Sequence, residues 1–161
     1  ARRAETSGTR VAMLRTGVVL SPAGGMLQQV LPLFLAGLGG PVATSGGESH
    51  DGSPWLSWIG ADDIAGAFAH AVLDDGVTGP LNAVAPEPVT AREFATVLGR
   101  VLRRPAAVPT PGFGPRLLLG AEGAEETVRA DQKALADRLL ASGYAMRDPE
   151  LEGALRHVLG R

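Results

Sequence analysis

The 161-residue sequence contains no cysteine, only one lysine (Lys133), and only 4% aromatic residues. The absence of cysteine excludes disulfide bonds, thiolate zinc sites and a cysteine nucleophile. The sequence also lacks a basic excess, because 15 basic residues face 17 acidic ones and the formal net charge is −2. Proteins that bind nucleic acid through counterion release normally carry a positive excess, so nucleic acid is not an expected partner.

The sequence has no uninterrupted hydrophobic run long enough to cross a membrane. Residues 16–47 are uncharged, but Gln28, Gln29, Pro32 and Pro41 interrupt them. A membrane-spanning helix needs about 20 continuous apolar residues. No apolar secretory signal follows the charged first residues either, so we expect a cytoplasmic protein without a membrane partner.

Familiar ligand-binding motifs are also missing. No G-x-G-x-x-G follows a predicted strand, and the sequence has no Gly-Lys pair from which a P-loop could be built. His50, His70 and His157 are scattered, so we interpret them as surface or half-buried histidines rather than as metal ligands or bases. The residues alone therefore predict no metal site and no catalytic group.

The hydrophobic pattern predicts an α/β protein, with early strands and helices in alternation followed by a helical end. Apolar, β-branched residues over 10–20 predict a strand that is covered on both faces, as in a parallel sheet. The further predicted strands are 55–59 and 81–85, and the predicted helices are 26–36, 62–73, 90–102, 115–119, 122–140 and 149–159.

Three helix starts have recognisable signals. Asp62 and Asp63 resemble an acid–base pair, but their place before an apolar helix favours helix capping. Thr90 and Glu93 have the spacing of a capping box, and Asp148-Pro149 predicts a capped start for the last helix.

Four blocks in the same order as in a known family carry a resemblance. They are residues 14–20 with Gly24-Gly25, 31–34 with 37–41, 55–59 with 62–64, and 79–90 with 93–94; a tail from 104 to 144 continues the pattern. The chain resembles the C-terminal half of an extended short-chain dehydrogenase/reductase. Within that group it is most similar to the NAD-dependent epimerase/dehydratase-like family with a C-terminal domain of unknown function.

The resemblance implies a partial Rossmann-like parallel sheet with a mainly helical substrate-binding lobe. It divides the chain into residues 1–103, which belong to the Rossmann-like and substrate-binding region, and 104–161, a small helical C-terminal domain. In the family an N-terminal Rossmann domain binds NAD or NADP, and a Tyr-x-x-x-Lys pair performs the chemistry. Here Tyr144 and Lys133 are eleven residues apart in the reverse order, so the resemblance implies no catalytic residue in this chain.

The resemblance also implies contact positions for cofactor and substrate. Residues 16–19 (Thr16, Gly17, Val18 and Val19) are expected beside the nicotinamide end of the cofactor. Gly17 has two open explanations, close approach of the backbone to a ring or relief of packing beside the sheet. Arg15, in a strand expected to be buried, is expected to pair with a carboxylate rather than with ligand.

Substrate contacts are expected at Leu56 and Trp58. Sugar-nucleotide epimerases carry an arginine at the position of Leu56, where it holds the substrate phosphate, so the leucine argues against a UDP-sugar substrate. The family histidine that follows the Trp-Ile pair is replaced by Gly60.

Two functions remain open from the sequence. The first is a substrate-binding C-terminal portion of an NAD(P)-dependent oxidoreductase, which binds no cofactor and is inactive alone. The second is a non-catalytic binding or assembly module derived from the same fold. The expected partners are a small-molecule substrate and either a missing N-terminal Rossmann segment or a second copy of the chain, because the strand at 10–20 lacks neighbours.

Overall fold

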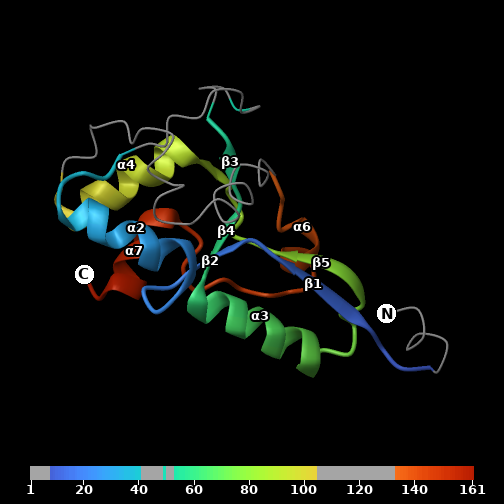
Figure 1. The fold of residues 1–161 in the computed structure, drawn as a ribbon. Coiled ribbons are helices and arrows are strands. Elements are labelled where there is room, and N and C mark those ends of the chain that lie inside the picture. Colours follow the sequence, from blue (N-terminus) through green and yellow to red (C-terminus); the bar gives the residue numbers. More distant parts are fainter. Residues whose placement is uncertain (1–7, 41–48, 50–52, 105–132) are drawn as a thin grey trace.

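The strands at the centre of the computed structural model are parallel pairs with helices packed around them (Figure 1). The structure describes residues 8–40, 49, 53–104 and 133–161. The strands are β1 (Ala12–Thr16), β2 (Val18–Leu20), β3 (Trp55–Leu56), β4 (Trp58–Gly60), β5 (Gly79–Ala83) and β6 (Val89–Thr90). The helices are α2 (Gly25–Leu35), α3 (Ala61–Leu73), α4 (Ala91–Leu102), α6 (Asp137–Ala141) and α7 (Leu151–Leu159). The predicted α/β class is confirmed.

The predicted strand over 10–20 is two strands that pair with different partners. β1 pairs in parallel with β5, whereas β2 pairs in parallel with β4. The exchange takes place at Gly17, whose N–H donates to the Ala83 carbonyl at 3.2 Å, while the Val18 N–H donates to the Ser57 carbonyl at 2.8 Å. The predicted strand at 55–59 divides in the same way at Ser57, because β3 pairs antiparallel with β6 and β4 pairs with β2.

The expectation that strand 10–20 is covered on both faces is wrong for its first half. In β1, Leu14 packs against apolar residues that lie between the strands and α3. Met13, however, is 37% exposed, and Arg15 is also exposed. Among the described residues β1 pairs only with β5, so its other edge is open. An apolar run by itself does not specify how many neighbours a strand has, which is why the pattern overestimated the burial.

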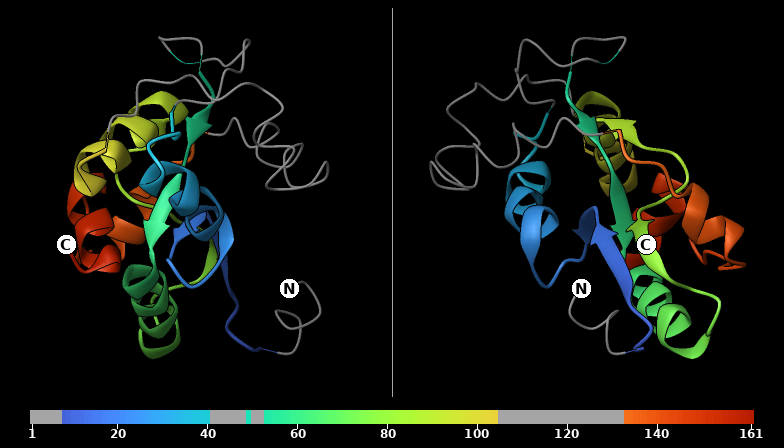
Figure 2. Two further views of the ribbon diagram at one scale, coloured as in Figure 1. Left: turned by 60° about the vertical axis from the view of Figure 1, so that its left-hand side comes forward. Right: turned by 90° about the vertical axis from the view of Figure 1, so that its right-hand side faces the viewer.

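The core consists of two apolar clusters on different sides of the strands. The larger cluster includes Leu20, Trp58 and Leu98 and packs β2 and β4 against α2, α4 and α7. The smaller cluster, centred on Ile59 and Leu81, packs β1 and β5 against α3 and α6. Figure 1 shows α2, α4 and α7 on one side of β1 and β5, with α3 below the strands, and Figure 2 shows the same elements from two further sides.

The helix starts agree only in part with their predicted signals. The capping box of α4 is confirmed: Thr90 Oγ1 accepts from the Glu93 N–H at 3.1 Å, and Glu93 Oε2 accepts from the Thr90 N–H at 2.7 Å. The predicted Asp148-Pro149 start of the last helix is wrong, because α7 has Glu150 as its N-cap. The helix predicted at 115–119 and residues 122–132 of the next one lie outside the described residues. No helix in the described part of the chain is long and apolar enough to span a membrane.

The sequence suggested that Asp63 caps α3, and the structure shows that this is wrong. The Asp63 carboxylate binds the C-terminal segment instead. The N-cap of α3 is Gly60, and the Asp63 side chain is only 2% exposed. Asp63 Oδ1 accepts from the Arg147 N–H at 2.8 Å and from the Tyr144 hydroxyl at 3.2 Å, and Oδ2 accepts from the Asp148 N–H at 3.1 Å. The first turn of a helix stabilises a negative charge, which suits a carboxylate held there.

We predict that Asp63→Ala destabilises the protein strongly. The substitution leaves the Arg147 and Asp148 N–H groups without their buried acceptor, and each such loss costs about 1–3 kcal/mol. The Tyr144 hydroxyl keeps the Asp63 backbone carbonyl as an acceptor. The free energy of unfolding in urea should therefore fall by about 2 kcal/mol or more. Asp62→Ala is the matched control, because the exposed contacts of Asp62 with Arg147 and His157 are each worth less than about 1 kcal/mol. Equal losses in the two variants would contradict this role of Asp63.

A second prediction concerns Gly17, where the strand changes partner. A Cβ atom at this position would lie 2.5 Å from the Ser57 carbonyl oxygen and 2.9 Å from Val84 Cγ1. Gly17→Ala should therefore cost about 1–3 kcal/mol in stability, as overpacking does in a close-packed site. Gly153→Ala in α7 is the control, because nothing lies within 4 Å of its added Cβ and alanine favours a helix by about 1 kcal/mol. Urea unfolding should show that Gly17→Ala lowers the free energy of unfolding and that Gly153→Ala raises it.

Candidate functional site

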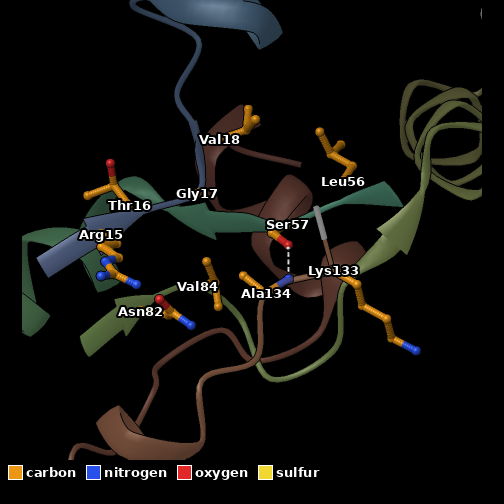
Figure 3. A pocket seen from close by; sticks show the side chains of 10 residues that line it. All are labelled: Arg15, Thr16, Gly17, Val18, Leu56, Ser57, Asn82, Val84, Lys133 and Ala134. Atoms are coloured by element: carbon orange, nitrogen blue, oxygen red, sulfur yellow. Dashed lines mark hydrogen bonds between the residues drawn. The ribbon is translucent and has the colours of Figure 1, made fainter. Parts of the chain in front are cut away.

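A groove opens where β1 and β5 end, beside the exchange of strand partners at Gly17. Its main pocket has a volume of about 560 Å³. The carboxyl ends of parallel strands are where open α/β sheets bind their ligands. The residues that line the pocket, drawn in Figure 3, are Arg15, Thr16, Gly17, Val18, Leu56, Ser57, Asn82, Val84, Lys133 and Ala134.

The structure brings most of the predicted contact positions to this pocket, but not all of them. Thr16, Gly17, Val18 and Leu56 line it. Val19 does not line the pocket, because successive side chains of a strand point to opposite faces. Val19 packs instead against the smaller apolar cluster. Whether the lining residues contact cofactor or substrate stays a prediction.

Trp58 lies in the core beside the groove, and its contact with substrate stays a prediction. Its side chain is 1% exposed within the larger apolar cluster, and its Nε1–H donates to the Glu87 carbonyl at 3.2 Å. It is not among the described residues that line the main pocket. Trp58 therefore supports the core behind the groove, and its neighbour Leu56 is the one that reaches the pocket.

Gly17 has a packing reason that is independent of any ligand. Its missing side chain leaves room for the Ser57 carbonyl and for Val84. This close approach permits the hydrogen bond from the Val18 N–H to the Ser57 carbonyl. Of the two explanations, relief of packing therefore has direct support, and the contact with a cofactor ring stays a prediction.

Asn82, Lys133 and Ala134 are lining residues that the sequence did not suggest. Asn82 lies opposite Arg15 in the register of β1 and β5, and its Nδ2 donates to the Leu135 carbonyl at 3.1 Å. The Ala134 N–H donates to Ser57 Oγ at 2.9 Å, which fixes residues 133–135 along the groove (Figure 3). No signal in the sequence joins these residues to β1, because only the strand register and the return of the chain bring them there.

Arg15 is placed differently from the expectation. It is exposed at the groove, and no carboxylate contacts it among the described residues. The prediction of a carboxylate partner depended on a buried strand, and the open face of β1 removes that premise. A second cavity of about 420 Å³ continues from the pocket along β5 and shares Arg15, Asn82 and Lys133 with it.

The only tyrosine and the only lysine are held at separate places. The Tyr144 hydroxyl donates to the Asp63 carbonyl oxygen at 2.9 Å, and its ring fills the space beside Gly66. Burial, together with the charge and the hydrogen bond of the Asp63 carboxylate, raises the pKa of Tyr144 to about 12. Lys133 Nζ lies 4.4 Å from the centre of the Trp55 ring, at the groove.

The histidines have ordinary structural contacts. His70 Nε2 lies 3.0 Å from Ser142 Oγ, and His157 Nε2 lies 2.8 Å from Asp62 Oδ2 at the surface. Within the described ranges no three histidine or carboxylate side chains are grouped as metal ligands. His50 lies outside the described residues.

The sequence matches a family model and several curated proteins. Residues 110–158 match the model described as "Domain of unknown function (DUF1731)". The chain is 37% identical over 160 residues to the epimerase family protein Mb2239 of Mycobacterium bovis, which covers 99% of this chain and 50% of the relative. It is 38% identical over 159 residues to the human epimerase family protein SDR39U1, with 99% of this chain and 52% of the relative covered. The chain thus spans about half the length of the curated relatives it matches.

Solved structures show the same fold. The human epimerase family protein SDR39U1 (isoform 2), solved with NADPH, matches with a TM-score of 0.80 and 37% identity, over 94% of this chain and 49% of that one. The Thermus thermophilus UDP-glucose 4-epimerase, solved with NAD, matches with a TM-score of 0.67 and 20% identity over 99% of this chain and 50% of that one, which is evidence for the fold alone. The Rossmann-like architecture is therefore confirmed. With this fold, these relatives and the matched C-terminal domain, the chain belongs to the NAD-dependent epimerase/dehydratase-like family that carries this C-terminal domain of unknown function.

Proposed function

We propose that this chain provides the substrate-facing half of an NAD(P)-dependent oxidoreductase, and that a separate nucleotide-binding segment completes the site against β1. The observation that carries the proposal is the position of the pocket, at the carboxyl ends of the parallel strands β1 and β5. The NADPH in the structure of the human relative supports the choice of cofactor class.

The pocket residues fit one end of such a cofactor better than the whole of it. Val18, Leu56 and Val84 provide an apolar wall, and the backbone at Gly17 is free of a side chain. These features suit a flat ring such as nicotinamide, which when bound supplies hydride transfer. The sequence has no G-x-G-x-x-G after a strand to bind a pyrophosphate, so we assign that contact to the companion segment.

Proton transfer is assigned to the companion segment for a related reason. Tyr144 is engaged with Asp63, and its pKa near 12 disfavours proton release at neutral pH. Lys133 lies at the groove, but it lies over the Trp55 ring. A tyrosine–lysine pair acting on the substrate would therefore have to enter from the other half of the site.

The open side of β1 suits the companion segment. Its second edge has no partner strand in the described part of the chain, and such an edge offers backbone N–H and C=O groups to a further strand. Met13 on β1 is 37% exposed, and Phe68 and Val72 on the adjacent α3 are 50% and 70% exposed. A segment that adds a strand to β1 and packs a helix on this surface would cover both features.

The same exposed residues favour one alternative, a non-catalytic assembly module. Phe68, Val72 and Leu73 form an apolar surface of a kind that often marks protein–protein contacts. A second copy of the chain could cover it without any cofactor. This alternative predicts a stable homodimer, which sedimentation of the isolated chain detects. It also predicts that adding a companion segment produces no NADPH binding.

The experiment for the main proposal is a titration with NADPH, followed by nucleotide fluorescence. The isolated chain is compared with the chain mixed with the N-terminal half of the Mycobacterium bovis relative, and size-exclusion chromatography reports whether the two assemble. We expect saturable NADPH binding only in the assembled mixture. Micromolar binding by the isolated chain, or an assembled complex that binds no NADPH, would overturn the division of labour proposed here.

A variant that fills the pocket should reduce NADPH binding without affecting the fold. Thr16→Trp places a large ring at an exposed position of the pocket wall. NADPH affinity of the assembled protein should fall by about tenfold or more, the loss of roughly one good contact. Thr96→Trp on the exposed face of α4 is the control and should bind NADPH like the parent. An unchanged affinity in Thr16→Trp would place the ligand elsewhere.

The assignment of Tyr144 to a structural role predicts its titration. Because it is the only tyrosine, phenolate absorbance reports this residue alone, and its midpoint should lie near pH 12 in the folded protein. A raised folded pKa means that the unfolded chain loses its proton first, near pH 10. The stability from the neutral hydroxyl should therefore be complete below pH 10 and fall between pH 10 and 12. Tyr144→Phe should lack this decline, and a folded midpoint at or below 10 would contradict the assignment.

A further inference from the structure

The positive charges that line the groove lack the carboxylate partners found elsewhere on the molecule. Arg10, Arg100, Arg147 and Arg156 each contact a carboxylate. Arg15, Lys133 and Arg138 line the two connected cavities of the groove, and in the described part of the chain none of them contacts one. One acidic residue, exposed Asp137, also lines the second cavity. The groove therefore holds a net positive charge on a chain whose formal net charge is −2.

The positions of these cations are fixed by neutral groups. Arg138 donates through Nη1 to the Pro80 carbonyl at 2.5 Å and through Nη2 to the Thr78 carbonyl at 3.1 Å. Lys133 lies over the Trp55 ring at 4.4 Å, a contact that orients an ammonium group without neutralising it. Their charges are thus held near the groove and remain uncompensated.

Arg15 is the cation best placed to contact a ligand. It lies opposite Asn82 in the parallel register, and Figure 3 shows the two side chains next to one another at the pocket. The Asn82 amide nitrogen donates to the Leu135 carbonyl, which turns its oxygen towards Arg15 in Figure 3. The guanidinium is exposed, and its planar set of N–H donors matches the two oxygens of a carboxylate or phosphate.

We propose that the groove binds an oxyanion group of the small-molecule substrate, a carboxylate or a phosphate, and that Arg15 is the residue that binds it. Arg138 and Lys133 raise the local positive potential, and Asn82 lies beside Arg15. This inference rests on the proposed function only in taking the anion to belong to the substrate.

The test uses the full chain without any cofactor or companion. The backbone amide resonances of isotope-labelled protein are followed while inorganic phosphate or succinate is added at constant ionic strength, with chloride replaced in compensation. We expect saturable shifts at Thr16, Asn82 and Ala134 with at least one of the two anions. The anion that saturates at the lower concentration identifies the phosphate or the carboxylate class.

Two variants and one control make the test specific. Arg15→Gln should weaken the binding by about tenfold or more, because hydrogen bonds to charged groups are the strong ones. Arg15→Lys should retain part of the affinity, because it keeps the charge and loses the paired donors. Arg104→Gln removes another exposed arginine outside the groove and should bind like the parent. The dispersion of the amide spectrum verifies that each variant is folded.

The results separate this proposal from the proposed function. Shifts that do not saturate, or that are equal in the parent and Arg15→Gln, would overturn the anion site. Saturable binding that Arg15→Gln weakens supports it, whatever the outcome of the NADPH titration. A protein that binds NADPH on assembly but no anion at Arg15 would retain the proposed function and lose this inference.

Discussion

The exchange of strand partners at Gly17 is the constraint on which the rest of the structure depends. One chain segment pairs first with β5 and then with β4, and the change requires the Ser57 carbonyl to approach the backbone where a side chain would otherwise lie. The two parallel pairs diverge at this point, and the groove opens between their ends. The change of strand partner and the groove thus both lie at one close backbone contact.

The C-terminal segment forms one wall of the groove. Asp63 holds residues 144–148 against α3, and Ser57 and Asn82 hold residues 134 and 135 beside the strands. Through these contacts the far end of the sequence contributes Lys133 and Arg138 to a wall that begins with Arg15. The described part of this C-terminal segment therefore completes the groove and supplies two of its cations.

The open side of β1 and the positive groove are two distinct features. The open edge exposes backbone hydrogen-bonding groups and apolar side chains, and both favour a protein neighbour. The groove exposes cations without carboxylate partners beside an apolar wall, and this combination favours a small anionic molecule. Both features meet at Arg15 and Thr16, so a neighbour added to β1 would also form part of the wall around the ligand.

The sequence by itself determined the local structure and the family. Apolar periodicity located the chain segments of β1 to β5 and the α3 and α4 helices, but not β6. The spacing of Thr90 and Glu93 fixed the start of α4, and four ordered blocks identified the relatives. Long-range contacts decided the rest. The sequence suggested Asp63 as a helix cap and Arg15 as a buried ion-pair residue. In the structure Asp63 binds a segment far along the chain, and Arg15 is exposed on β1. Periodicity reports which residues avoid water, but only the register and the return of the chain decide which groups meet at the groove.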